Sequence, residues 1–165
     1  MTRRLFVFAV LFSVAALRTQ ADGFLDRCDR EIVATCLVLE AGGEGPEGMQ
    51  AVLNVILNRS GGNLYRMVPE TVKPGAFSCM ASVWKSDLPD YEPLISCAKD
   101  QSAAYEEATQ LIALMEEGFL ADNTHGATHY HAASIHPYWA DSLRYLTTIG
   151  GHHFYVEYNN RLALL

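Results

Sequence analysis

The first regular pattern along the chain is a helical stripe of apolar residues that ends in a carboxylate. Val33, Cys36 and Leu37 lie seven, four and three residues before Glu40, so a helix places all four side chains on one face. An aspartate near position 26 suits the start of this helix, and two glycines after Ala41 predict its end. Glu40 is therefore expected on the apolar stripe and not on the solvent face.

A second helix is predicted from about position 45 to about position 59, where Pro46 suits the first turn. It is apolar almost all round except for Gln50, Asn54 and Asn58, which are spaced i, i+4, i+8 along one face. Amides of this kind can bind the hydroxyl and acetamido groups of a sugar. They equally suit contact with water or with neighbouring backbone, and the pattern leaves both interpretations open.

The rest of the chain changes from helical to strand-like patterns. Segment 63–99 contains four prolines and is predicted to be mostly irregular. A third helix is predicted over 102–117, and strands over 127–132 and 147–158, the latter with a hairpin turn at glycines 150–151. The order indicates an α+β fold, a mostly helical domain with a small antiparallel sheet near the C-terminus.

The length of 165 residues, half of them apolar, fits one domain with one core. Residues 1–21 are expected to be a signal peptide, because Arg3 and Arg4 precede an apolar run of 13 residues and Ala21 suits cleavage. That run is short for a membrane span, and an uncleaved anchor is the alternative. Domain 22–165 is thus expected to be secreted, periplasmic or in the cell envelope, with no stable membrane span.

The exported part is strongly acidic. The chain has 12 basic and 19 acidic residues, and removal of residues 1–21 takes three arginines and no acid, which leaves 9 against 19 and a net charge of −10. A protein that binds phosphates needs a basic stripe, and the remaining lysines and arginines are scattered. Nucleic acid is therefore excluded as a partner, and a neutral or amphoteric substrate is expected.

Four cysteines lie in the exported part, where an oxidising compartment would let them pair. Cys28 and Cys36 are eight residues apart on the predicted helix, about 10–12 Å between Cα atoms, which is too far for a disulfide. Either both bridges run from this helix to Cys79 and Cys97, or Cys79 pairs with Cys97 and the first two remain thiols. We favour the second arrangement.

All six histidines lie between His125 and His153. His129 and His131 share one strand face, an arrangement that also occurs in zinc sites. The spacing matches no metalloprotease motif with two histidines and a glutamate, and no cysteine lies in the cluster, so we predict no metal and no cofactor. Histidines among aromatic residues suit a carbohydrate groove. The residues predicted to line that groove are His129, Tyr130, His131, Trp139, His152 and Tyr155.

Four blocks of the chain, in this order and at these separations, resemble the SleB/CwlJ-type cell wall hydrolases, whose founding members are spore cortex-lytic enzymes. The blocks are LVLEAGGEGPEGMQAVLNVILNR, PGAFSC, GATHYHAASIHPYWADSL and TIGGHHFY, and they span about 32–155. The resemblance implies a mostly helical catalytic domain similar to lysozyme-like lytic transglycosylases. It also implies that the partner is the glycan strand of peptidoglycan.

The resemblance further implies roles for single residues. The catalytic glutamate of the family corresponds to Glu40, its second acidic residue to Glu44, and its asparagine–arginine pair to Asn58 and Arg59. Leu39 departs from the family, which often has Ala or Tyr there. No repeated peptidoglycan-binding module precedes the domain, so the chain looks more like the short exported versions of Gram-negative bacteria than like spore members.

The expected chemistry agrees with these roles. Cleavage of a glycosidic bond needs an acid for the leaving oxygen, and hydrolysis usually adds a second carboxylate. A lytic transglycosylase manages with one glutamate, which protonates that oxygen and then takes the proton of the sugar's 6-hydroxyl. An apolar surrounding favours the protonated form of Glu40 that the first step needs.

Two points stay open from the sequence. Glu44 is a candidate second carboxylate, a candidate residue that orients Glu40, or a charge at the start of the second helix, and we favour the last role. The alternative function is a zinc-dependent peptidoglycan amidase that uses the histidine cluster.

Overall fold

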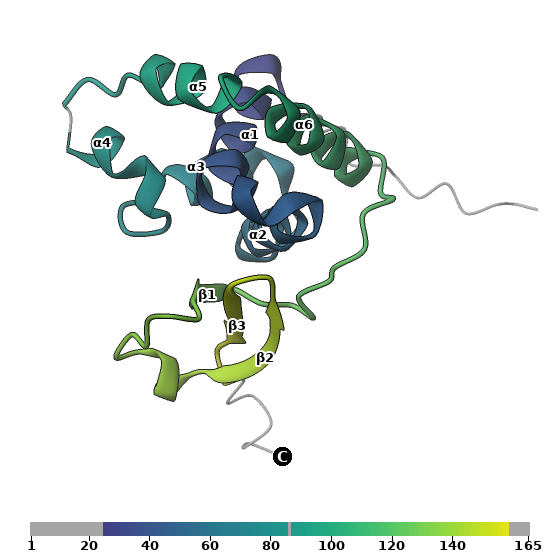
Figure 1. Cartoon of the computed structure of the whole chain (residues 1–165), viewed down its shortest axis with the longest axis vertical. Helices are drawn as coiled ribbons and strands as arrows, with labels where there is room; N and C mark the ends of the chain where they lie inside the picture. Colours follow the sequence, from purple (N-terminus) through teal and green to yellow (C-terminus); the bar gives the residue numbers. More distant parts are fainter. Residues whose placement is uncertain (1–24, 86, 159–165) are drawn as a thin grey trace, which may run out of the picture.

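The computed structural model describes residues 25–85 and 87–158, in which a group of helices lies over a small sheet (Figure 1). The α-helices are α1 (Arg27–Ala41), α2 (Gly45–Ser60), α3 (Met67–Val72), α4 (Ala81–Trp84), α5 (Glu92–Lys99) and α6 (Ser102–Glu116). The strands are β1 (His129–Ala132), β2 (Arg144–Ile149) and β3 (His152–Val156). The predicted signal peptide lies outside the described residues. Within them, no helix has the length and apolar character needed to cross a membrane.

Helices α1 and α2 begin and end close to the predicted positions. The Asp26 side chain accepts a hydrogen bond from the Asp29 N–H over 2.8 Å and caps α1, as an aspartate at this position should. Pro46 lies in the first turn of α2, and Gly61 ends the helix in the left-handed region at φ 68°. That conformation disfavours residues with a side chain, which explains why a glycine ends α2.

The prediction that segment 63–99 is mostly irregular is wrong. The segment contains α3, α4 and α5 and two short 3₁₀ turns, η2 (Leu64–Arg66) and η3 (Ser78–Met80). Its prolines are compatible with these short helices, because Pro69 and Pro93 lie in the first turns of α3 and α5, where the backbone N–H has no intrahelical partner.

The main core surrounds α1, which packs against α2, α3, α5 and α6. The apolar stripe of α1 is fully buried at Val33, Cys36 and Leu37, as its spacing predicts. Other side chains that are fully buried in this core are Met49, Val52, Leu53, Ile56, Met67, Met80 and Ile112. The carboxylate at the end of the stripe is thereby held against a rigid helical body.

The sheet has the order β1-β3-β2, with both pairs antiparallel. Strands β2 and β3 form the predicted hairpin, which turns at glycines 150–151. The predicted second strand segment began at Thr147, whereas β2 begins at Arg144 and continues past an irregularity between Tyr145 and Thr147. This irregularity interrupts the alternation of the strand, which is why the sequence pattern missed its first residues.

A second, smaller core joins the sheet to the helices. Ala51 and Val55 of α2 pack with Ala127, Ile149 and Phe154, and Phe154 is fully buried. Helix α2 therefore has α1 on one side and the sheet on another (Figure 1). Two buried faces explain why its sequence is apolar almost all round.

Candidate active site

Glu40 lies in the last turn of α1 and lines a cavity of about 400 Å³ between the helices and the sheet. The lining comes from three regions that are far apart in the sequence. Leu39 and Glu40 come from α1, Ala76, Phe77 and Ser78 from the segment that leads into η3, and Tyr130, His131, Ala132, Ile135 and His152 from the sheet and its connection. The Glu40 side chain is half-buried at the wall of this cavity.

Three hydrogen-bond donors hold the Glu40 carboxyl group. Its Oε1 accepts from the Ser78 hydroxyl over 3.1 Å and from the Cys79 N–H over 2.8 Å, and its Oε2 accepts from the Tyr130 hydroxyl over 2.9 Å. Both oxygens are thus fixed by groups that lie 38 to 90 residues further along the chain. A carboxyl group held in this way is pre-organised for proton transfer.

Tyr130 belongs to β1 but faces the helices. Its ring stacks on Phe154 at 5.6 Å between centroids and meets the edge of His152 at 5.1 Å. Burial, together with the nearby Glu40 carboxylate, raises the pKa of the Tyr130 phenol well above its usual value. Tyr130 therefore keeps its proton and acts as a hydrogen-bond donor to Glu40.

Glu44 connects the start of α2 with the β2–β3 hairpin. Its Oε2 accepts from the Gly151 N–H over 3.0 Å, its Oε1 lies 3.0 Å from His152 Nδ1, and the side chain makes no capping bond on α2. A Cβ at Gly150 would collide with Glu44 Oε2, so the hairpin approaches Glu44 closely because position 150 is a glycine. Glu44 thus reaches Glu40 only indirectly, because His152 packs on Tyr130 and Tyr130 donates to Glu40.

His129 and His131 lie on the same strand, as predicted, but their side chains pack against other residues of the protein. His129 and His131 both pack against Trp139, at 5.7 and 5.5 Å between ring centroids. His131 is buried, and its Nε2 lies 2.9 Å from the Tyr155 hydroxyl. In the described part of the chain, no three His, Cys, Asp or Glu side chains come together in a way that could hold a metal ion.

The structure divides the predicted binding residues other than His129 into three groups. Tyr130, His131 and His152 line the cavity of Glu40, whereas Trp139 and Tyr155 pack on the histidines. The amides of Gln50, Asn54 and Asn58 donate to the segment 121–127, with Gln50 and Asn54 both bonding the Ala121 carbonyl. The amide stripe thus binds neighbouring backbone, one of the two interpretations left open by the sequence.

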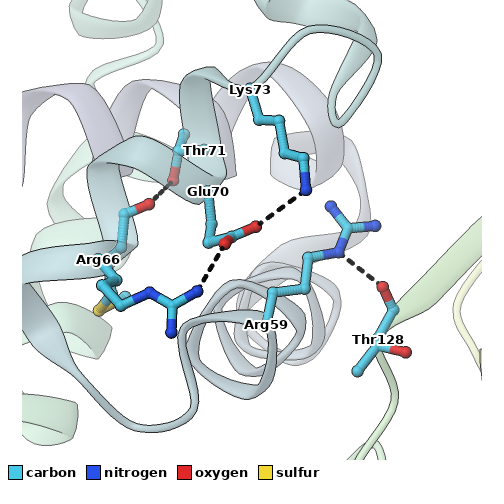
Figure 2. A network of polar contacts seen from close by, with 7 residues as sticks. Arg59, Arg66, Glu70, Thr71, Lys73 and Thr128 are labelled. Atoms are coloured by element: carbon cyan, nitrogen blue, oxygen red, sulfur yellow. Dashed lines mark hydrogen bonds and ion pairs between the residues drawn. The ribbon is translucent and has the colours of Figure 1, made fainter.

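His129 lines an adjoining cavity of about 290 Å³ together with Arg59, Lys73 and Glu157. The Arg59 Nε donates to the Thr128 carbonyl over 2.6 Å, as Figure 2 shows. Its guanidinium lies 5.1 Å from the centre of the Phe77 ring, and burial lowers the pKa of this guanidinium. Arg59 thereby connects α2 both to the start of the sheet and to Phe77, the neighbour of Ser78.

Sequence reasoning missed Ser78 and Cys79 as partners of Glu40. The signal for these two residues was the PGAFSC block of the family resemblance. The cysteine prediction also needs correction, because no Cys79–Cys97 disulfide is present and all four cysteines are free. Cys79 lies instead against Cys36, with the two Sγ atoms 3.9 Å apart.

Comparisons with known proteins agree with the fold and identify a family. The family model of cell wall hydrolases matches residues 43–155. The catalytic domain of the germination-specific lytic transglycosylase SleB from Bacillus anthracis has a similar fold, with a TM-score of 0.58 and 22% identity over 82% of this chain and 98% of that domain. The catalytic domain of Bacillus cereus SleB matches with the same score and identity over 84% of this chain and 98% of that domain. No curated protein matches the chain.

The fold and the site define a cell wall-degrading enzyme with a mostly helical catalytic domain and a small sheet. The chain belongs to the cell wall hydrolase family. The family match begins at Gly43, three residues after Glu40, so the role of Glu40 rests on its contacts in the cavity.

Proposed function

We propose that the protein cleaves the glycan strands of peptidoglycan as a lytic transglycosylase, with Glu40 as its single general acid and base. The observation that carries this proposal is that Glu40 is the one carboxylate among the described residues that line the 400 Å³ cavity. Glu44 is occupied by Gly151 and His152. A single carboxylate in the cavity suits a mechanism in which the sugar's own hydroxyl, and not water, attacks.

In the proposed reaction Glu40 acts twice. As the acid, it gives its proton to the glycosidic oxygen, and the bond to the muramic residue breaks. As the carboxylate, it takes the proton of the 6-hydroxyl, whose oxygen closes the 1,6-anhydro ring. Ser78, Cys79 and Tyr130 hold the carboxyl group throughout and stabilise the negative charge that it carries after the first proton transfer.

The lining of the cavity supports a neutral sugar as the substrate. Tyr130 and His152 are half-buried and offer ring surface to the cavity, and His131, whose two nitrogens bond Ala132 and Tyr155, lies beside them in its wall. We propose that Tyr130, His131 and His152 bind sugar units beside Glu40. Because this substrate lies outside the cytoplasm, we propose that residues 1–21 direct the domain to the cell envelope.

Mass spectrometry of muropeptides released from purified peptidoglycan tests the proposal. We expect products lighter by one water molecule than those of hydrolysis, and we expect the same products in the presence of a chelator. Reducing-end products would show a hydrolase instead. Release of stem peptides that stops on chelation would establish the zinc amidase alternative and contradict the role of Glu40.

Two variants of Glu44 test whether this residue positions His152 or acts as a second catalytic carboxylate. We expect Glu44→Ala to lower the turnover number about 10-fold, because His152 and the hairpin lose their anchor. Glu44→Gln should restore most of the activity, since the amide oxygen can still accept from the Gly151 N–H. If Glu44→Gln is as inactive as Glu44→Ala on purified peptidoglycan, Glu44 takes part in the chemistry.

Tyr130→Phe removes one donor to Glu40 and leaves the ring in place. We expect the turnover number to fall about 10- to 100-fold with little change in the folding midpoint, because a hydrogen bond to a charged group is lost. Tyr145→Phe is the matched control, since Tyr145 is 52% exposed and its hydroxyl lies beside Thr148. Equal activities of the two variants would show that the Tyr130 hydroxyl does not support Glu40.

A further inference from the structure

Two cysteines, Cys36 and Cys79, lie next to Glu40, and the proposed reaction does not use their sulfur atoms. Cys36 precedes Glu40 by four residues on α1, so both lie on one face of the helix. Cys79 belongs to η3, and its N–H donates to Glu40 Oε1 over 2.8 Å. Its Sγ lies 3.9 Å from the Sγ of Cys36, so one residue contacts both the carboxylate and the buried thiol.

We propose that Cys36 and Cys79 form a site of oxidative modification, at which a disulfide links α1 to η3. Sulfur atoms in a disulfide are about 2.05 Å apart, so the two thiols must approach each other by about 2 Å. Their segments already pack together through Glu40, and Met80 of η3 is fully buried in the same core as Cys36. Cys28 and Cys97 are exposed, and in the described residues neither sulfur contacts another cysteine.

The modification is a thiol–disulfide exchange with a disulfide of another molecule as the oxidant. Cys79 is the more accessible of the two and attacks first as a thiolate. Its Sγ bonds to one sulfur of the oxidant and the other sulfur leaves as a thiolate. Cys36 then loses its proton and attacks Cys79 Sγ, which releases the second half of the oxidant. The pair loses two electrons and two protons, and the oxidant becomes two thiols.

Burial decides the order of these steps. Cys36 is fully buried, and burial together with the contact to Cys79 raises the pKa of its thiol well above the usual value. Cys36 is therefore a poor first nucleophile and becomes effective when the mixed disulfide is already held against it. The half-buried Cys79 is the residue that a soluble disulfide reaches first.

The disulfide would act on both stability and the position of the donors to Glu40. It closes a long loop that runs from α1 through α2 and α3 to η3, and such a link restricts the unfolded chain. We expect the thermal midpoint to rise by about 10 °C on oxidation. The link also holds Ser78 and Cys79, which supply two of the three hydrogen bonds of Glu40, on the helix that carries Glu40.

Oxidised glutathione tests the proposal. The wild-type protein and a Cys28→Ser/Cys97→Ser variant are treated with it, digested without reductant and mapped by mass spectrometry. We expect in both a cross-linked pair of peptides that contain Cys36 and Cys79, two hydrogen masses lighter than the free pair. We also expect a higher thermal midpoint, which dithiothreitol reverses.

Cys36→Ser in the same double-variant background is the matched control. It should keep glutathione on Cys79 and show no rise of the midpoint, because no second thiol displaces the adduct. Two results would overturn the proposal. One is that Cys79 keeps glutathione although Cys36 is present, and the other is that both thiols are unchanged after the treatment. The readout is a mass, so its failure is independent of whether Glu40 cleaves glycan strands.

Discussion

Glu40→Gln is expected to lower the rate of glycan cleavage by about 10³-fold, because the amide can neither donate a proton to the glycosidic oxygen nor accept one from the 6-hydroxyl. The change keeps the shape of the side chain. The amide oxygen can still accept from two donors of the cavity wall, and the thermal midpoint should therefore stay close to that of the wild type. Release of muropeptides from purified peptidoglycan measures the rate.

Glu47→Gln is the control for this variant. It makes the same chemical change at an exposed glutamate in the first turn of α2, outside the described cavity. We expect its activity to equal that of the wild type. If Glu40→Gln remains within about 10-fold of the wild type, the general acid is another group, and the single-glutamate mechanism is wrong.

Phe154→Ala has the largest expected effect on stability. Phe154 lies at the centre of β3, is fully buried and joins the sheet to α2 through the second core. Its loss removes the aromatic ring and leaves a cavity, so we expect the free energy of unfolding to fall by about 4 kcal/mol. Denaturation with urea, with an unchanged slope, measures this value.

The loss of Phe154 should also reduce activity at urea concentrations below the unfolding midpoint, where the variant is still folded. Tyr130 stacks on this ring, and its hydroxyl holds Glu40, so a displaced Tyr130 weakens the site. Tyr145→Ala serves as the control, because this aromatic residue of β2 is half-exposed and should cost about 1 kcal/mol or less. Similar losses for the two variants would show that the sheet is not held by the second core.

Elements whose signals are local could be predicted from the amino-acid sequence. The apolar stripe of α1, its aspartate cap, Pro46 at the start of α2 and the glycine turn of the hairpin each depend on residues a few positions apart. Glu40 was identifiable as a candidate because it continues the stripe. The short helices of 63–99 were missed, because prolines exclude a helix interior but are compatible with a first turn.

The contacts of each polar side chain, in contrast, follow from the folded arrangement of distant segments. Whether an amide stripe binds a sugar or a loop depends on the segment that packs against it, and segment 121–127 covers Gln50, Asn54 and Asn58. In the same way, Cys79 meets Cys36 and Glu40 because η3 folds back onto α1, across a separation of about 40 residues. Sequence periodicity defines the face of a helix, whereas the partner of that face follows from packing among distant elements.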